Sequence, residues 1–178
     1  MIRKKKNFVR PKKAFELSRI QEENTLVERY GLKNKKEIWK TSAKVNYFRK
    51  RAMSLVQSSL EEQEVLFNKL RALGLKITGT VDVLGLKPID LLERRLPTVI
   101  AKKGLAETPK HGRQLVVHKK VLINGKVTDS PSYLVSVSEE DKISIKEKKK
   151  SPKAEPTEGN EKSEETAQII DNNEGEEQ

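Results

Sequence analysis

The sequence contains no cysteine, only two histidines, and few aromatic residues, which make up 4% of its 178 residues. The lack of cysteine excludes disulfides, thiol catalysis and cysteine-ligated metal sites, and two histidines leave little for any other transition-metal site. No Walker loop or metal-ligand spacing appears either, and no cofactor is expected. Apolar residues amount to 34%, below the roughly 45–50% of typical domains, which argues against one dense core over the whole chain. No apolar run approaches the roughly 20 residues that span a bilayer, and the basic N-terminus lacks the apolar stretch of a signal peptide.

Charge is abundant and unevenly distributed. The net charge is +11, but residues 1–60 carry +12, residues 61–100 are neutral, residues 101–150 carry +6 and residues 151–178 carry −7. A basic body of this kind predicts a soluble cytoplasmic protein with a polyanionic partner and no membrane association. The acidic tail either shields this body before the partner binds or is an inert extension.

Composition and periodicity predict an α+β chain in four parts. Residues 1–13 read as a basic arm and residues 14–93 as a helical region. Residues 94–147 read as a small module of two short helices packed on an antiparallel sheet, and residues 148–178 as a disordered acidic tail, because so few apolar residues cannot offset the entropy of ordering.

Apolar spacing and turn residues locate the individual elements. Helices are expected over 14–30, 35–58, 88–95, 97–103 and 108–118, and a capping box of Ser59 and Glu62 predicts another that ends at Gly74. Residues 75–86 read as a loop, or at most one helical turn. Asn124-Gly125 predicts a tight hairpin, residues 133–137 alternate as a strand, residues 139–141 make a turn, and residues 143–145 form a last strand.

The small module carries a set of polar and basic residues suited to phosphate. A helix that begins at Thr108 offers unbonded N–H groups, and an arginine adds a planar fork for two phosphate oxygens. The predicted RNA contacts in this module are Lys102, Lys103, Thr108, Lys110, Arg113, Gln114, His118, Lys119, Lys120 and Lys126. Alternatively, Arg113 is a solvated helix-face cation and His118 a packed residue that anchors the turn to the hairpin.

Two further basic segments precede the module. The helix over 35–58 and the residues just before it supply predicted contacts at Lys33, Lys35, Lys36, Lys40, Lys44, Arg49, Lys50 and Arg51. The arm supplies Arg3, Lys4, Lys5, Lys6, Arg10, Lys12 and Lys13. The only tryptophan, Trp39, either stacks on a base or packs its helix onto the body.

The module resembles the S-four RNA-binding domain. The stretch KGLAETPKHGRQLVVHKKVLINGKV is similar to the signature of that domain, and PSYLV and EEDKISI match its closing strands. Upstream, YGLKNKKEIWK, VNYFRKRA and DLLERRL resemble the ribosomal S-four family of the archaeal and eukaryotic branch, so the resemblance covers roughly residues 10–147.

This resemblance implies a component of the small ribosomal subunit rather than an enzyme. The family binds a multi-helix junction in the five-prime domain of the small-subunit ribosomal RNA early in assembly. It also helps to line the messenger RNA entry channel beside ribosomal proteins S-five and S-three. The alternatives are a stand-alone stress or ribosome-rescue factor and an RNA-modifying enzyme that uses this domain for binding.

The sequence departs from the family pattern at several positions. Gly112 stands where alanine is usual, which costs roughly 0.5–1 kcal/mol in a helix interior. Lys119 and Lys120 replace a usual Gly-His pair, which removes a flexible joint, and Pro97 replaces a polar residue. The zinc site of some bacterial members is absent because the chain has no cysteine.

Overall fold

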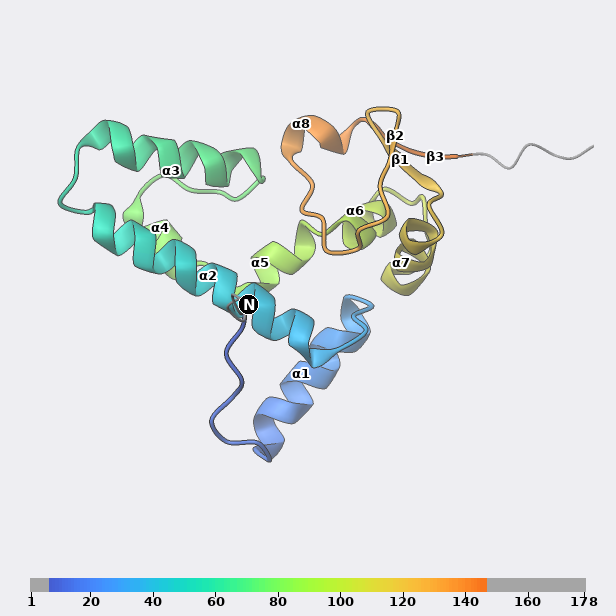
Figure 1. Ribbon diagram of the computed structural model, residues 1–178, viewed down its shortest axis with the longest axis horizontal. Helices are drawn as coiled ribbons and strands as arrows, with labels where there is room; N and C mark the ends of the chain where they lie inside the picture. The colour runs from blue at the N-terminus through green and yellow to red at the C-terminus, as the bar shows by residue number, and fades with distance from the viewer. Residues whose placement is uncertain (1–6, 147–178) are drawn as a thin grey trace, which may run out of the picture. The chain divides into compact units, whose positions relative to one another are not determined.

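The computed structural model describes residues 7–146 and confirms an α+β fold (Figure 1). The elements in chain order are α1 (Leu17–Arg29), α2 (Lys35–Leu55), α3 (Leu60–Ala72), α4 (Thr80–Gly85), α5 (Pro88–Glu93), α6 (Leu96–Lys102), α7 (Pro109–Val117), β1 (Val121–Ile123), β2 (Lys126–Val127), α8 (Val137–Glu140) and β3 (Ile143–Ile145). The predicted arm contacts at residues 3–6 and the predicted disorder of residues 148–178 lie outside the described residues.

The longest helix, α2, organises the N-terminal half. Its apolar stripe of Val45, Phe48 and Ala52 recurs at helical spacing and is buried against α3, α4 and α5. The other end of α2 enters a second cluster, in which Ile38 meets Tyr30 and Leu32 beyond the end of α1. One helix therefore joins two small apolar clusters.

The structure corrects the expectation of a loop over residues 75–86. Residues Thr80–Gly85 form α4, which exceeds the single helical turn allowed from the sequence. The Asp82 carboxylate accepts hydrogen bonds from the backbone N–H groups of Thr78 (2.8 Å) and Gly79 (3.1 Å), and Val83 is fully buried. The Thr78 hydroxyl donates to the same carboxylate, and this hydrogen bond, followed by the two backbone ones, lowers the pKa of Asp82. Together with the buried Val83 side chain, these hydrogen bonds explain why a glycine-containing segment becomes helical.

The C-terminal module packs α6 and α7 on a three-stranded antiparallel sheet with strand order β2-β1-β3. Its core contains Val99 and Ile100 of α6, Val116 of α7 and Val121 of β1. The predicted Asn124-Gly125 hairpin is confirmed, since both residues adopt the positive φ that this turn requires, at 52° and 75°.

Gly112 lies at the closest approach of the two module helices. A Cβ atom placed there would lie 2.7 Å from the carbonyl oxygen of Pro97. Because real Cβ contacts are longer than this, only glycine permits the observed spacing of α6 and α7. Gly112 and Pro97 are both departures from the family pattern, and the structure places them in contact.

The predicted strand over residues 133–137 forms only in part, because residues 133–135 make two backbone hydrogen bonds to residues 94–96, and the predicted turn at 139–141 begins only at Asp141. Leu134 makes a single bridge to Arg95, and residues 137–140 form α8 instead. The Glu139 carboxylate accepts from both the backbone N–H (3.2 Å) and the hydroxyl (2.8 Å) of Ser136. This cap begins a helix where the apolar alternation alone predicted an extended chain.

Candidate nucleic-acid interface

The N-terminus of α7 has the geometry expected from the sequence. The Thr108 hydroxyl accepts a hydrogen bond from the backbone N–H of His111 at 3.2 Å, and Pro109 occupies the first turn. The side chains of Lys110, Gln114 and His118 are exposed on this helix. The structure therefore places these predicted contacts on a solvent-accessible surface.

The end of α7 continues that surface into the hairpin. Lys119 is exposed and adopts φ 58°, the left-handed conformation in which glycine is usual. The N–H groups of Lys119 and Lys120 donate to the carbonyls of Val116 and Leu115, both at 3.0 Å, which closes the helix. The loop geometry expected for a glycine is thus kept, but a side chain occupies the strained position.

Arg113, the favoured phosphate ligand, is directed toward the protein interior. Its guanidinium makes two hydrogen bonds to Glu37 of α2, at 2.7 and 3.1 Å. Arg95 contacts the same carboxylate at 2.8 Å and also donates to the carbonyl of Pro131 and the hydroxyl of Ser132. Arg113 therefore takes part in an ion-pair triad with Glu37 and Arg95, and a phosphate contact by it stays a prediction.

The triad controls the protonation of its carboxylate. Burial by itself raises the pKa of Glu37, but the hydrogen bonds and positive charges of Arg113 and Arg95 outweigh burial and lower it. The Arg95 side chain is only 4% exposed, so Glu37 supplies the charge that neutralises a nearly buried guanidinium. Since Glu37 lies in the first turn of α2, this ion pair connects α2 to the module.

Backbone packing reinforces the same connection. Gly31, which follows α1, has φ 58°, and a Cβ atom there would lie 2.7 Å from the backbone nitrogen of Lys110. The end of α1 therefore sits directly against the first turn of α7. This contact fixes the basic N-terminus of α7 relative to the helical region.

Two of the other predicted RNA contacts in the module already pair with acceptor groups of the protein. Lys102 pairs with Glu93 at 2.9 Å, and Lys103 donates to the backbone carbonyl of Glu140 and lies 3.5 Å from Asp141. Lys126, in β2, is exposed. The exposed lysines of α7 and the hairpin thus present their charge to solvent, whereas the two lysines at the end of α6 approach acceptors.

The predicted RNA contacts of α2 and of the segments before it likewise include exposed cations and cations that pair with protein groups. Lys36, Lys40, Lys44, Lys50 and Arg51 are exposed, as are Lys33 before the helix and Arg10, Lys12 and Lys13 in the N-terminal segment. In contrast, Arg49 donates to the carbonyl of Leu86 at 2.6 Å. Lys35 lies 3.8 Å from Glu23, so it faces α1.

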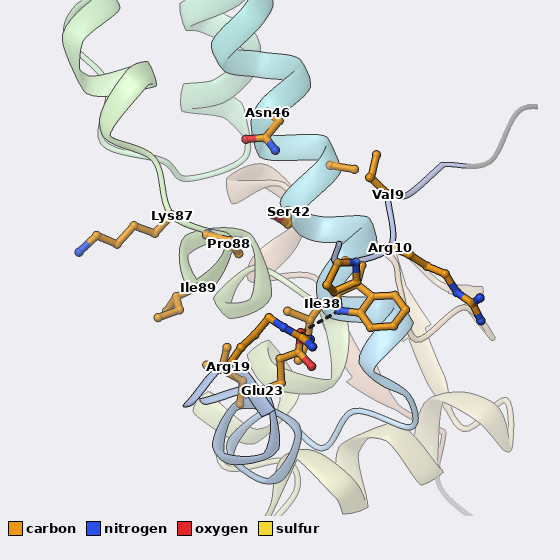
Figure 2. A pocket seen from close by; sticks show the side chains of 14 residues that line it. Val9, Arg10, Arg19, Glu23, Ile38, Ser42, Asn46, Lys87, Pro88 and Ile89 are labelled. Atoms are coloured by element: carbon orange, nitrogen blue, oxygen red, sulfur yellow. Dashed lines mark hydrogen bonds and ion pairs between the residues drawn. The ribbon is translucent and has the colours of Figure 1, made fainter. Parts of the chain in front are cut away.

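Trp39 packs against α1 and is not free to stack on a base. Its indole N–H donates to Glu23 at 2.8 Å, and Arg19 donates to the same oxygen at 2.8 Å. Figure 2 shows Arg19 and Glu23 of α1 beside Ile38 of α2, in a cleft of about 440 Å³. The Phe8 ring lies 6.0 Å from the indole, which ties the N-terminal segment to α2.

Comparison with known proteins agrees with this geometry. A family model described as the S4 domain matches residues 94–141, which contain α6, α7 and the hairpin. The chain is 41% identical over 145 residues to the small ribosomal subunit protein uS4 of Methanothermobacter thermautotrophicus, covering 78% of this chain and 85% of that protein. It is 47% identical over 133 residues to the uS4 protein of Methanococcus aeolicus, covering 71% of this chain and 75% of that protein. The chain belongs to the uS4 family.

Membership of the uS4 family confirms the resemblance inferred from the sequence. Over residues 7–146 the structure contains no helix that is long and apolar enough to cross a membrane. In the same part of the chain, acidic and histidine side chains nowhere gather into a cluster that could hold a metal ion.

Sequence reasoning missed two features of this uS4 surface. Arg95 emerged as a buried partner of Glu37 only from the structure, because Arg94-Arg95 reads as any basic pair and Arg95 is 58 positions from Glu37. Tyr47 is 57% exposed, and it follows Lys36, Lys40 and Lys44 at helical spacing. That spacing is readable from the sequence and could have marked Tyr47.

Proposed function

We propose that this protein is a structural, non-enzymatic component of the small ribosomal subunit that binds small-subunit ribosomal RNA in the cytoplasm. The observation that carries the proposal is the similarity to relatives named small ribosomal subunit protein uS4 over 70–78% of the chain. The exposed cations of α2, α7 and the hairpin support it, because a polyanion is the natural partner of such a surface.

The finer assignment follows the family resemblance. The RNA target is a multi-helix junction of the five-prime domain, bound early in assembly, and the bound protein lies with ribosomal proteins S-five and S-three near the messenger RNA entry channel. The proposed division of labour places a basic arm at 1–13, a helical region at 14–93 and the RNA-binding module at 94–147. A junction suits this arrangement because two basic surfaces can contact two RNA helices.

Binding is mainly electrostatic and shape-based. Bases in an A-form duplex are inaccessible from the deep groove, so lysines on helices and hairpins contact phosphates and read backbone shape. Each phosphate that a lysine neutralises releases condensed counterions, which lowers the affinity steeply as salt rises. Glu37 contributes indirectly, since its pair with Arg95 and Arg113 holds α2 and α7 in a fixed relation.

The proposal is tested by titrating the full chain with a five-prime-domain RNA of its own small-subunit ribosomal RNA at several salt concentrations. If six to ten phosphates are contacted, we expect a roughly 10³- to 10⁵-fold loss of affinity between about 50 and 200 mM salt. An affinity that does not change with salt would contradict the proposal. Sucrose-gradient fractionation provides the second readout, in which stoichiometric recovery in salt-washed small subunits is expected.

A further inference from the structure

A second groove lies between the N-terminal segment and the exposed face of α2. Two of its lysines are predicted RNA contacts, but neither the family comparison nor the sequence motifs assign a nucleotide to the groove itself. It has a volume of about 560 Å³. One side is formed by Asn7, Phe8 and Val9, and the other by Lys40, Ala43, Lys44 and Tyr47. Figure 2, which draws the neighbouring cleft, shows Val9 beside α2. A space of this size is typical of sites that hold a small ligand.

The α2 wall of the groove combines cations with one exposed aromatic ring. Lys40, Lys44, Tyr47 and Arg51 are spaced by four, three and four residues, which places them on one face of the helix. The Tyr47 side chain is 57% exposed, although its neighbour Phe48 is buried in the core. Among the described residues that line the groove, two are lysines and none is acidic.

Within residues 7–146, neither lysine of the groove forms an ion pair with an acidic side chain. Lys44 is exposed, but the protein atoms around its ammonium group displace part of its hydration, and this desolvation together with the positive charge of Lys69 lowers its pKa. Two ammonium groups that repel each other in this way are relieved when an anion such as a phosphate binds beside them. A second basic chain segment is a poor occupant of this groove for the same electrostatic reason.

We propose that this groove binds one unpaired ribonucleotide, with its base stacked on Tyr47 and its phosphate held by Lys40 and Lys44. The proposal rests on the RNA-binding function proposed above and adds an unpaired position to it. Stacking on an exposed aromatic ring beside cations is the usual way in which proteins bind unpaired nucleotides, and it tolerates any base. A base within a duplex is not available to such a ring.

The test compares substitutions at Tyr47 in the full chain, using the five-prime-domain RNA as probe. Tyr47→Ala removes the ring, and we expect a roughly 5- to 100-fold weaker affinity. Tyr47→Phe keeps the ring and should bind within about 2-fold of the wild type. Val81→Ala, at another exposed apolar position that is 80% exposed, is the matched control and should leave the affinity unchanged. Circular dichroism of each variant checks that the helices are retained.

The salt dependence of the affinity distinguishes the groove proposal from the proposed function, the binding of ribosomal RNA. Tyr47→Ala should leave the salt slope of the affinity unchanged, whereas the double variant Lys40→Gln, Lys44→Gln should reduce it by roughly one phosphate contact. In competition, an oligoadenylate should displace the RNA roughly 5- to 100-fold better than an abasic oligonucleotide of equal length, because only the former has a base to stack. If Tyr47→Ala binds like Tyr47→Phe while the wild type keeps its steep salt slope, the groove proposal is refuted and ribosomal RNA binding stands. A wild type without salt-dependent RNA binding refutes the proposed function itself.

Discussion

Removal of the Glu37 carboxylate is the most informative single perturbation of this fold. Glu37→Ala leaves the Arg95 guanidinium, with a side chain only 4% exposed, without its ionic partner. Breaking a buried ion pair from one side costs about 3–5 kcal/mol, because the remaining charge stays desolvated. Arg113, at 18% exposure, recovers part of its hydration, so the main cost comes from Arg95. We expect Glu37→Ala to lower the free energy of unfolding by about 3 kcal/mol.

Urea denaturation at pH 7 measures this loss, and a surface pair provides the control. Glu93 and Lys102 pair at a similar distance, 2.9 Å, but their side chains are 39% and 57% exposed. Glu93→Ala should therefore cost less than about 1 kcal/mol. Arg113→Ala should fall between the two, since Glu37 then keeps Arg95. Equal losses for Glu37→Ala and Glu93→Ala would refute the reasoning that burial of Arg95 sets the magnitude.

The contribution of the Glu37 ion pairs to the free energy of unfolding depends on pH in a defined way. The pKa of Glu37 in the folded protein is lowered from the ordinary value of 4.5 by its two arginines. A carboxyl group of this kind stabilises the fold fully above its unfolded pKa and loses that effect as the pH falls through the folded pKa. The stability difference between the wild type and Glu37→Gln should thus be constant near neutral pH and shrink below about pH 4.5. A difference that grows on acidification would contradict the assigned ion pair.

The remaining predictions concern backbone geometry and are measured by the same urea denaturation. Gly112→Ala should destabilise the fold by about 1–3 kcal/mol despite the better helix propensity of alanine, because its Cβ would lie 2.7 Å from the carbonyl oxygen of Pro97. A gain in stability would show that α6 and α7 can separate at little cost. Lys119→Gly should stabilise the fold by about 1 kcal/mol, because it relieves the left-handed conformation at φ 58°. No gain at that position would mean that the added freedom of glycine in the unfolded chain offsets the relief.

Local signals in the sequence predicted most elements correctly. The Thr108-Pro109 start of α7 and the Asn124-Gly125 hairpin depend on the conformational preferences of the residues themselves, so neighbouring residues were sufficient to locate them. The predicted strand at 133–137 is shorter than expected because an alternation of apolar residues does not report the Ser136–Glu139 cap, which begins a helix at Val137. The helix α4 was underestimated because its stability depends on hydrogen bonds to Asp82 and on burial of Val83.

The candidate site was predictable in composition but less so in geometry. Net charge and helix spacing identified the exposed lysines of α2 and α7, whose positions depend on local structure alone. They could not reveal that Arg113 turns toward Glu37, since the two residues are 76 positions apart and meet only after the chain folds. A basic residue on a polar helix face looks the same in sequence whether it serves a phosphate or a carboxylate.

The segment after the hairpin couples the unfolding of the helical region to that of the C-terminal module. Leu134 packs against the cluster formed by α2, α3 and α4, whereas the next residue, Val135, is buried in the module core. Successive side chains of an extended segment point to opposite sides, so one peptide unit contributes to both clusters. When one cluster loses its packing, the peptide that joins Leu134 to Val135 is freed, and the neighbouring side chain in the other cluster loses its anchor. We therefore expect residues 30–145 to melt in one cooperative transition, with backbone amides of both clusters exchanging with solvent at similar rates.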